Sequence, residues 1–179
     1  MAAWALYLLA VHPDIEAAVH AEVDRVLAGT PAAYQHLDAL EKTRQVLTET
    51  LRLYPPTWLI TRTVTHDTEL GSARLAAGTT LAYSPYLIHH RSDLYPDPNL
   101  FDPARWEAAR PDRSAYIPFG AGARKCIGDR FSLTQAALAM AAITARWQLT
   151  PVSNRPVRPA PLNATVSPRR LRMRLTARS

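Results

Sequence analysis

The sequence of 179 residues contains a single cysteine, Cys126, and this scarcity removes several classes of site. One thiol cannot form an intramolecular disulfide, and it cannot build a zinc site from a cluster of cysteines. The six histidines are scattered, and none belongs to the His-Glu-x-x-His helix that is typical of zinc proteases. Any metal or nucleophilic sulfur chemistry in this chain therefore falls to Cys126.

Lysine is also scarce, since all but two of the 21 basic residues are arginine, and the formal net charge is +6. A basic excess is typical of nucleic-acid-binding proteins. The densest arginine cluster, residues 169–178, argues against that function, because Leu171, Met173 and Leu175 alternate there with other residues. Such alternation predicts a half-buried strand. We therefore expect no nucleic-acid partner, and a basic face that binds an acidic electron-transfer protein explains the charge better.

No hydrophobic run is long enough to cross a membrane, which takes about 20 residues. The segment from Met1 to Val11 is apolar throughout, but it lacks the basic residues that begin a signal peptide. A helix that is apolar on every face is normally buried on every face. We interpret this segment as the second half of a longer buried helix that is cut at Met1, and we expect a cytoplasmic protein.

Apolar spacing and chain-breaking residues predict a mainly α fold with a small antiparallel β component (α+β). Pro13 and Gly29 bound one expected helix, and Pro55 stops another that begins near Glu41. Further helical segments are expected at Ser84–His90 and Asp129–Arg146, and Thr30–Ala39 is expected to be a connector or a short helix. Irregular chain is expected at 93–106, followed by a second loop at 107–118. The expected strands are Trp58–Thr65, Glu69–Leu75 and Thr79–Tyr83, which form one small sheet, and a closing pair near Trp147–Val152 and Leu171–Thr176.

Two of these elements carry charged residues in apolar surroundings. Glu49 and Arg52 are three residues apart on the helix that begins near Glu41, so the two side chains can meet. A solvated surface pair would contribute little to stability. The neighbouring leucine and valine residues favour a partly buried pair instead. Arg62, within a predicted strand, needs an anionic partner unless it faces the solvent.

The most specific local signal is the loop of residues 119–128, Phe-Gly-Ala-Gly-Ala-Arg-Lys-Cys-Ile-Gly. Three glycines let the backbone turn tightly and pass close to a flat or bulky group. Arg124 and Lys125 precede Cys126, and a helix is expected to begin at Asp129. Adjacent cations and a helix N-terminus both favour the thiolate over the thiol. Cys126 is therefore either a nucleophile or a metal ligand.

This loop resembles the haem-binding loop of the cytochrome P-450 family, whose pattern is Phe-x-x-Gly-x-Arg-x-Cys-x-Gly. Every position of that pattern is matched, by Phe119, Gly122, Arg124, Cys126 and Gly128. The pattern is specific, and two weaker motifs accompany it in the family's order.

The first of these, Glu49-x-x-Arg52 followed by Leu-Tyr-Pro-Pro, resembles the Glu-x-x-Arg helix of that family. The second, Phe101-Asp-Pro-Ala-Arg105-Trp106, resembles the segment whose arginine completes a Glu-Arg-Arg triad with that helix. The residues on either side of Arg105 depart from the commonest form of the segment, but neither removes the guanidinium.

The resemblance covers essentially the whole chain and is to the C-terminal part of the cytochrome P-450 fold. It implies that residues 1–179 form a single partial domain without the N-terminal half. It also implies a haem-thiolate monooxygenase that contains haem b and inserts one atom of dioxygen into a small, hydrophobic organic substrate. The electrons would come from a ferredoxin- or reductase-type donor.

The resemblance implies a role for each matched residue. Cys126 would be the proximal ligand of the haem iron, and backbone N–H groups near Ile127 and Gly128 would hydrogen-bond its sulfur. Arg124 and Arg62 would each pair with a haem propionate. The remaining implied roles are packing beside the haem for Phe119, loop geometry for Gly122, a structural triad for Glu49, Arg52 and Arg105, and substrate contacts for Pro56, Thr57, Trp58 and Leu59.

One departure from the family leaves the catalytic residues unassigned. The family activates oxygen with an acid/alcohol pair in a pattern like Ala/Gly-Gly-x-Asp/Glu-Thr, and the chain contains no such pattern. Two alternatives stay open. A thiol enzyme with Cys126 as nucleophile would need a base such as His89 or His90 within reach. A truncated, inactive remnant or one piece of a split cytochrome P-450 would bind haem weakly, with one face open to water. Arginine- and alanine-rich usage indicates a bacterial source.

Overall fold

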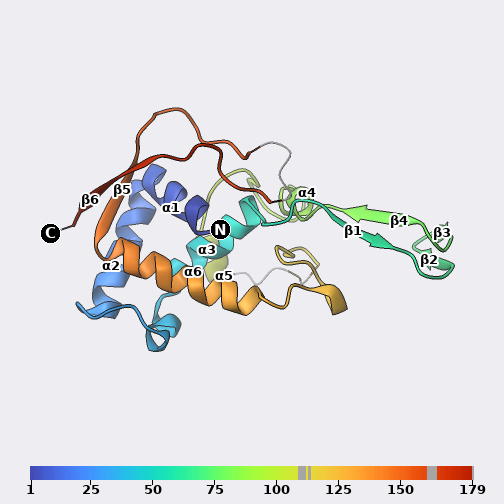
Figure 1. The fold of residues 1–179 in the computed structure, drawn as a ribbon, viewed down its shortest axis with the longest axis horizontal. Coiled ribbons are helices and arrows are strands. Elements are labelled where there is room, and N and C mark those ends of the chain that lie inside the picture. The colour runs from blue at the N-terminus through green and yellow to red at the C-terminus, as the bar shows by residue number, and fades with distance from the viewer. Residues whose placement is uncertain (109–111, 113, 161–164, 179) are drawn as a thin grey trace.

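The computed structural model describes residues 1–108, 112, 114–160 and 165–178, which form a helical body with a β extension at one side (Figure 1). The helices are α1 (Ala2–Val11), α2 (Pro13–Leu27), α3 (Glu41–Leu53), α4 (Pro85–His89), α5 (Arg105–Ala108) and α6 (Asp129–Thr144), with the 3-10 helices η1 (Tyr34–Ala39) and η2 (Gly122–Arg124). The strands are β1 (Ile60–Thr63), β2 (Thr68–Leu70), β3 (Ala73–Leu75), β4 (Thr80–Tyr83), β5 (Trp147–Pro151) and β6 (Met173–Ala177). The predicted α+β class is confirmed.

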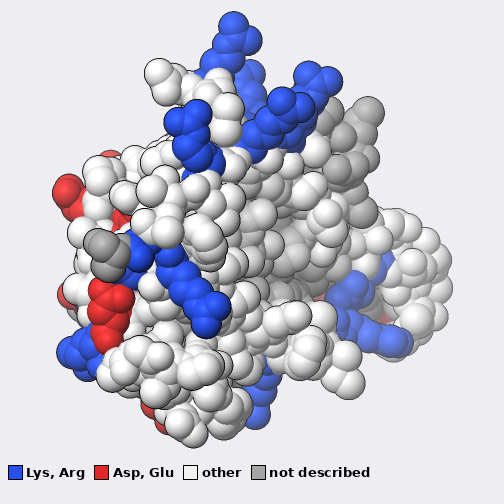
Figure 2. Space-filling view, turned by 60° about the vertical axis from the view of Figure 1, so that its left-hand side comes forward, with Lys and Arg blue, Asp and Glu red and all other residues white. Residues whose placement is uncertain are grey.

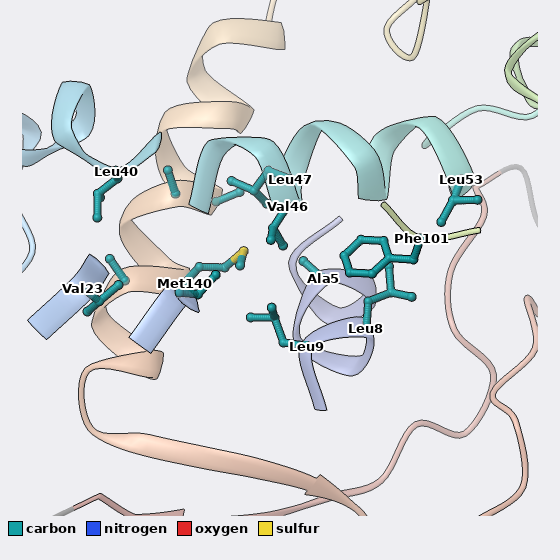
Figure 3. Packing of buried hydrophobic residues seen from close by; sticks show 14 of the residues in the cluster. Ala5, Leu8, Leu9, Val23, Leu40, Val46, Leu47, Leu53, Phe101 and Met140 are labelled. Carbon is teal, nitrogen blue, oxygen red and sulfur yellow. The ribbon is translucent and has the colours of Figure 1, made fainter. Parts of the chain in front are cut away.

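The hydrophobic core lies where α1, α2, α3 and α6 meet, and Figure 3 shows side chains from these helices pointing toward one another. Met140 of α6 is completely buried at the centre of this cluster. The predicted burial of the apolar helix α1 on every face is confirmed in part, since Trp4, Ala5 and residues 7–9 are buried whereas Ala3 and Val11 are exposed. Its Trp4 ring stacks on Tyr54 with centroids 3.8 Å apart, and Trp4 Nε1 donates to the Val166 carbonyl over 2.8 Å.

The start of α3 is fixed by a carboxylate from a different helix. Leu40, which precedes α3, has no side chain that can cap it. Glu22 of α2 accepts hydrogen bonds there from the Lys42 N–H (2.6 Å), the Thr43 N–H (2.9 Å) and the Thr43 hydroxyl (2.9 Å). Otherwise unsatisfied N–H groups at a helix start favour such an anionic partner. This contact therefore sets the register of the helix that carries Glu49 and Arg52.

The strands pair antiparallel as two-stranded ladders, β1 with β4, β2 with β3 and β5 with β6. The prediction of one sheet from the first three segments is wrong, since β1–β4 and β2–β3 are separate ladders. The predicted single strand Glu69–Leu75 is also wrong. Gly71, with φ +59°, reverses the chain between β2 and β3, and this left-handed backbone conformation favours glycine. Figure 1 shows both ladders extending away from the helices.

The C-terminal strand pair is confirmed, with β5 and β6 in the register Trp147↔Ala177 to Pro151↔Met173. The half-burial predicted from the alternating leucines is wrong in part, because the Leu175 side chain is 54% exposed. The prediction of irregular chain over 93–106 is wrong at its end, where residues 105 and 106 begin the short helix α5. Residues 109–111 and 113 of the expected loop 107–118 lie outside the described residues. Among the described residues, no helix has both the length and the apolar character needed to cross a membrane.

Replacing Met140 by alanine should lower the free energy of unfolding by about 2–5 kcal/mol, because the surrounding helices cannot close fully on the cavity left behind. Chemical denaturation of the two proteins measures this difference. Leu175→Ala is the matched control, because its side chain is mostly exposed, and it should cost less than about 0.5 kcal/mol. Equal costs for the two substitutions would contradict the assignment of the core.

Candidate functional site

Glu49 is completely buried in α3, and five N–H groups donate to its carboxylate. Arg52 Nε donates to Oε2 and Arg52 Nη2 to Oε1, each over 2.8 Å. Arg105 Nε lies 3.0 Å from Oε1, Trp106 Nε1 lies 3.0 Å from Oε2, and the Asp102 N–H lies 3.1 Å from Oε1. The structure thus brings the three predicted triad residues together and adds two donors that the sequence analysis missed.

Arg52 also fixes an irregular part of the chain through its remaining N–H groups. Nη1 donates to the carbonyls of His89 over 2.9 Å and Pro98 over 2.6 Å, and Nη2 donates to the Leu100 carbonyl over 3.0 Å. Arg52 has no exposed surface, so each of its N–H groups needs such a partner. The proline-rich chain after α4 is therefore held to α3 by a buried cation.

Two tyrosines join the next segment to this cluster. Tyr95 Oη donates to the Ala115 carbonyl over 2.9 Å, and Tyr116 Oη donates to the Thr48 carbonyl of α3 over 3.1 Å. Burial raises the pKa of Tyr95 to about 12, and burial raises the pKa of Tyr116 as well. Both hydroxyls are therefore protonated donors at neutral pH, and they hold residues 115 and 116 in place.

The cysteine loop follows directly and is shaped by its own backbone. The Gly120 N–H donates to the Ile117 carbonyl over 3.0 Å, and the Cys126 N–H donates to the Phe119 carbonyl over 2.9 Å. Gly120 has φ +75° and Gly122 has φ +68°, a left-handed conformation that side chains other than glycine rarely adopt. Cys126 consequently lies just before α6, as the sequence predicts.

Cys126 lies on a cavity of about 490 Å³ between this loop, β1 and the segment after α3. The predicted site residues that line it are Pro56, Thr57, Arg62, Phe119, Arg124 and Cys126, and the lining residues that the sequence analysis did not assign are Met1, Ile60, Pro118, Gly120 and Ser132. Ser132 follows Gly128 by four residues, so helical spacing could have placed it beside the loop. No sequence pattern points to the other unassigned lining residues, because distant parts of the chain bring them to the cavity.

Both cavity arginines present guanidinium groups without a carboxylate. Arg62 is half-buried, donates from Nη1 to the Thr61 carbonyl over 2.8 Å and lies 6.0 Å from the centroid of the Tyr83 ring. Arg124 is exposed in η2. Within the described ranges, neither arginine forms an ion pair, although the exposed Lys125 beside them does, with Asp129. The cavity therefore combines a thiol with two cations that no carboxylate of the described residues pairs with.

Several predicted site residues do not line the cavity. Trp58 and Leu59 are exposed, with 46% and 39% of their surface accessible, and lie outside its walls. Ile127 is fully exposed, whereas Gly128 lies beside the thiol, since a Cβ there would lie 3.8 Å from Cys126 Sγ. Across the described chain, no hydrogen bond reaches Sγ, so the bonds expected from the N–H groups of Ile127 and Gly128 stay a prediction.

His89 and His90, the candidate bases for a nucleophilic thiol, form hydrogen bonds with backbone groups away from Cys126. His90 Nδ1 lies 2.8 Å from the Tyr86 carbonyl, and His89 is buried between backbone groups of Arg52 and Ile117. Neither belongs to the walls of the cavity that holds Cys126. This arrangement counts against the thiol-enzyme alternative.

Comparison with known proteins agrees with the geometry. The sequence model of the family described as Cytochrome P450 matches residues 2–174. Cyclooctatin synthase of Streptomyces melanosporofaciens is 46% identical over 172 residues, which cover 94% of this chain and 38% of that protein. Pentalenene oxygenase of Streptomyces avermitilis is 44% identical over 179 residues, 98% of this chain and 40% of that protein. Cyclooctat-9-en-7-ol 5-monooxygenase of Streptomyces melanosporofaciens is 48% identical over 153 residues, 84% of this chain and 33% of that protein.

A cysteine loop before a helix and a buried glutamate shared by two arginines thus define the class of the fold and its site. The chain belongs to the cytochrome P450 family. It spans 38% and 40% of the length of the first two relatives, so it corresponds to a part of such a protein.

The residues on the cavity fit the haem that the family implies. Haem offers an iron that takes a thiolate ligand and propionates that take cations. Cys126 supplies the sulfur, and Arg62 and Arg124 supply two guanidinium groups whose charges no described carboxylate neutralises. Gly120, at positive φ, brings the backbone to the cavity wall without a side chain.

Replacing Glu49 by glutamine tests the buried cluster. The glutamine amide would turn an NH2 group toward N–H donors, so at least two donors would lose their acceptor and two buried arginines would lose their counter-charge. We expect the free energy of unfolding to fall by about 3–5 kcal/mol in denaturation experiments. The control is Asp93→Asn, which breaks the exposed Arg91–Asp93 pair and should leave stability unchanged. A stability of Glu49→Gln equal to that of the control would show that the cluster contributes nothing.

Proposed function

We propose that this chain is the C-terminal, haem-binding part of a haem-thiolate monooxygenase, one partial domain over residues 1–179, with Cys126 as the proximal ligand of haem b. The observation that carries the proposal is the cavity on which the single thiol of the chain lies together with Arg62 and Arg124. Haem ligated by a thiolate supplies the activation of dioxygen, through which one oxygen atom enters an organic substrate.

The residues of this chain bind and orient the cofactor. Arg62 and Arg124 would pair with the propionates, because a guanidinium and a carboxylate form paired hydrogen bonds. Phe119 packs beside the ring. Pro56 and Thr57, on the same cavity, contact the substrate, and they are better placed for this role than Trp58 and Leu59.

The partners are also proposed. The substrate is a small, hydrophobic organic molecule, and the similarity to pentalenene oxygenase and cyclooctatin synthase supports an oxygenase in a bacterium. The electron donor is an acidic ferredoxin- or reductase-type protein in the cytoplasm. Its support is the net charge of +6 and the distribution of basic side chains. Figure 2 shows a group of Lys and Arg at the upper edge of the face drawn, with further basic side chains elsewhere on it, and Asp and Glu mainly at its left.

One observation favours a second candidate, in which this chain alone is inactive or is one piece of a split protein. The described surface leaves Cys126 exposed and, next to it, Ile127 fully and Phe131 71% exposed. A haem bound there would keep one face in contact with water. We therefore expect this chain alone to bind haem weakly, and a second segment that covers the cavity would tighten the binding.

Loading the chain with excess haem, reducing it and adding carbon monoxide should give the red-shifted difference band of a thiolate ligand. Cys126→Ser should abolish that band, because its hydroxyl is a poor ligand of reduced iron. Ser132→Ala is the matched control, since it changes one side chain of the same cavity and leaves the thiol intact. A band typical of a histidine ligand in the unaltered chain, or a thiolate-type band that survives in Cys126→Ser, would refute the role of Cys126.

Arg62→Ala and Arg124→Ala should each weaken haem binding about tenfold, the loss of roughly one charge-assisted hydrogen bond at a partly solvated site. Absorbance titration with haem measures the two dissociation constants. Arg74→Ala removes an exposed arginine from β3, where its Nε lies 3.2 Å from Glu69, and should leave haem affinity unchanged. If all three variants bound haem equally well, the propionate roles would be wrong.

A further inference from the structure

His89 is a completely buried histidine whose two ring nitrogens contact different parts of the backbone. Nδ1 lies 3.1 Å from the carbonyl oxygen of Arg52 at the end of α3, and Nε2 lies 2.9 Å from the Ile117 nitrogen. A carbonyl oxygen can only accept and a backbone N–H can only donate. The neutral ring with its proton on Nδ1 is therefore the form that satisfies both partners.

The surroundings keep the imidazole in this neutral form. Burial is the main cause that lowers the pKa of His89 to about 4, and the charges of Arg52 and His90 act in the same direction. The Tyr116 ring stacks on the imidazole at a centroid distance of 5.5 Å, and the Tyr95 ring lies edge-on at 6.4 Å. Both tyrosines are protonated at neutral pH, and the carboxylate of Glu49 is already matched by two arginines. The Nε2 lone pair is thus free to accept from Ile117.

A continuous series of hydrogen bonds runs from this contact to Cys126. Ile117, held by His89, accepts through its carbonyl from the Gly120 N–H and so closes the turn that contains Phe119. The Phe119 carbonyl in turn accepts from the Cys126 N–H over 2.9 Å. His89 holds the peptide group before Ile117, and the peptide group after it accepts from Gly120, so the backbone position of Ile117 limits where the Phe119 carbonyl that holds Cys126 can lie.

We propose that His89 is a positioning residue that connects the end of α3 to the cysteine loop and thereby fixes the backbone position of Cys126. It acts through Ile117 and does not touch the cavity. Tyr95 and Tyr116 hold residues 115 and 116 independently, so loss of the His89 contact should loosen the loop from residue 117 onward while the chain before it stays in place.

This role of His89 rests on the proposed function, because a displaced Cys126 would be a poorer ligand of the haem iron. The hydrogen-exchange readout of its test, however, does not depend on haem and is taken on the chain without the cofactor. Failure of haem binding in the unaltered chain would overturn the proposed function and leave the His89 contact untouched, so the two failures are distinguishable.

Two conservative substitutions separate the contacts of the ring. The amide of asparagine lies near the position of Nδ1, so His89→Asn can still donate to Arg52 and loses Ile117. The amide of glutamine reaches the position of Nε2, so the oxygen of His89→Gln can still accept from Ile117. Hydrogen exchange at the amides of Gly120 and Cys126 reports on the loop, and exchange in α3 reports on the remainder of the fold.

His89→Asn should accelerate exchange at the Gly120 and Cys126 amides by at least about tenfold relative to α3, whereas His89→Gln should stay close to the unaltered chain. With excess haem, the thiolate-type carbon monoxide band should shrink in the asparagine variant and persist in the glutamine variant. His90→Gln is the matched control, since His90 bonds only to its own helical turn in the described structure, and it should change neither readout.

Three results would overturn the proposal. Unchanged loop exchange in His89→Asn would show that Ile117 needs no acceptor. Acceleration of α3 and the loop to the same extent, including complete unfolding of the asparagine variant, would show that His89 only stabilises the fold. Acceleration of the loop in both variants would show that the contact with Ile117 is not the one that matters.

Discussion

The buried carboxylate of Glu49 on α3 holds together the segments that lead to the cysteine loop. Glu49 has no access to water, so its carboxylate is tolerable only because two guanidinium groups, an indole and a backbone N–H surround it. Arg52 is three residues away on the same helix, whereas the other donors lie 53 to 57 residues further along the chain. Satisfying Glu49 therefore holds the irregular segment of residues 96–106 against α3, together with Phe101, which packs into the hydrophobic core.

Hydrogen bonds connect this cluster to the chain that leads to Cys126. Arg52 fixes one carbonyl at the end of α4 and two in the chain after it. Tyr95 and Tyr116 fix residues 115 and 116, and the His89 ring accepts from the N–H of Ile117. The loop beyond this point has little side-chain packing, and its shape comes from backbone hydrogen bonds and two glycines at positive φ. The exposed thiol of Cys126 is thus connected through these hydrogen bonds to a buried cluster in which the charge of Glu49 is paired with arginines. Such a cluster on the protein side suits a ligand whose position must be set before a cofactor binds.

The features that could be predicted from the sequence are those with local signals. Pro13, Gly29 and Pro55 mark the limits of helices, and the loop glycines with Cys126 and Arg124 identify the site by pattern. Contacts between distant segments had no such signal. The capping of α3 by Glu22, the indole of Trp106 on Glu49 and the two contacts of His89 each join segments at least 20 residues apart. Gly71 is a strong turn former within a predicted strand, yet strand propensity around it concealed the turn between β2 and β3.

The most direct test of the account is X-ray absorption at the iron edge of the haem-loaded chain, which counts the atoms bound to iron without reference to activity. The account predicts one sulfur neighbour in addition to the four haem nitrogens, and the loss of that sulfur when Cys126 is replaced by serine. An iron surrounded only by nitrogen and oxygen in the unaltered chain would contradict it, because the one thiol of the sequence would then not be the ligand for which the loop, the arginines and the buried cluster are arranged.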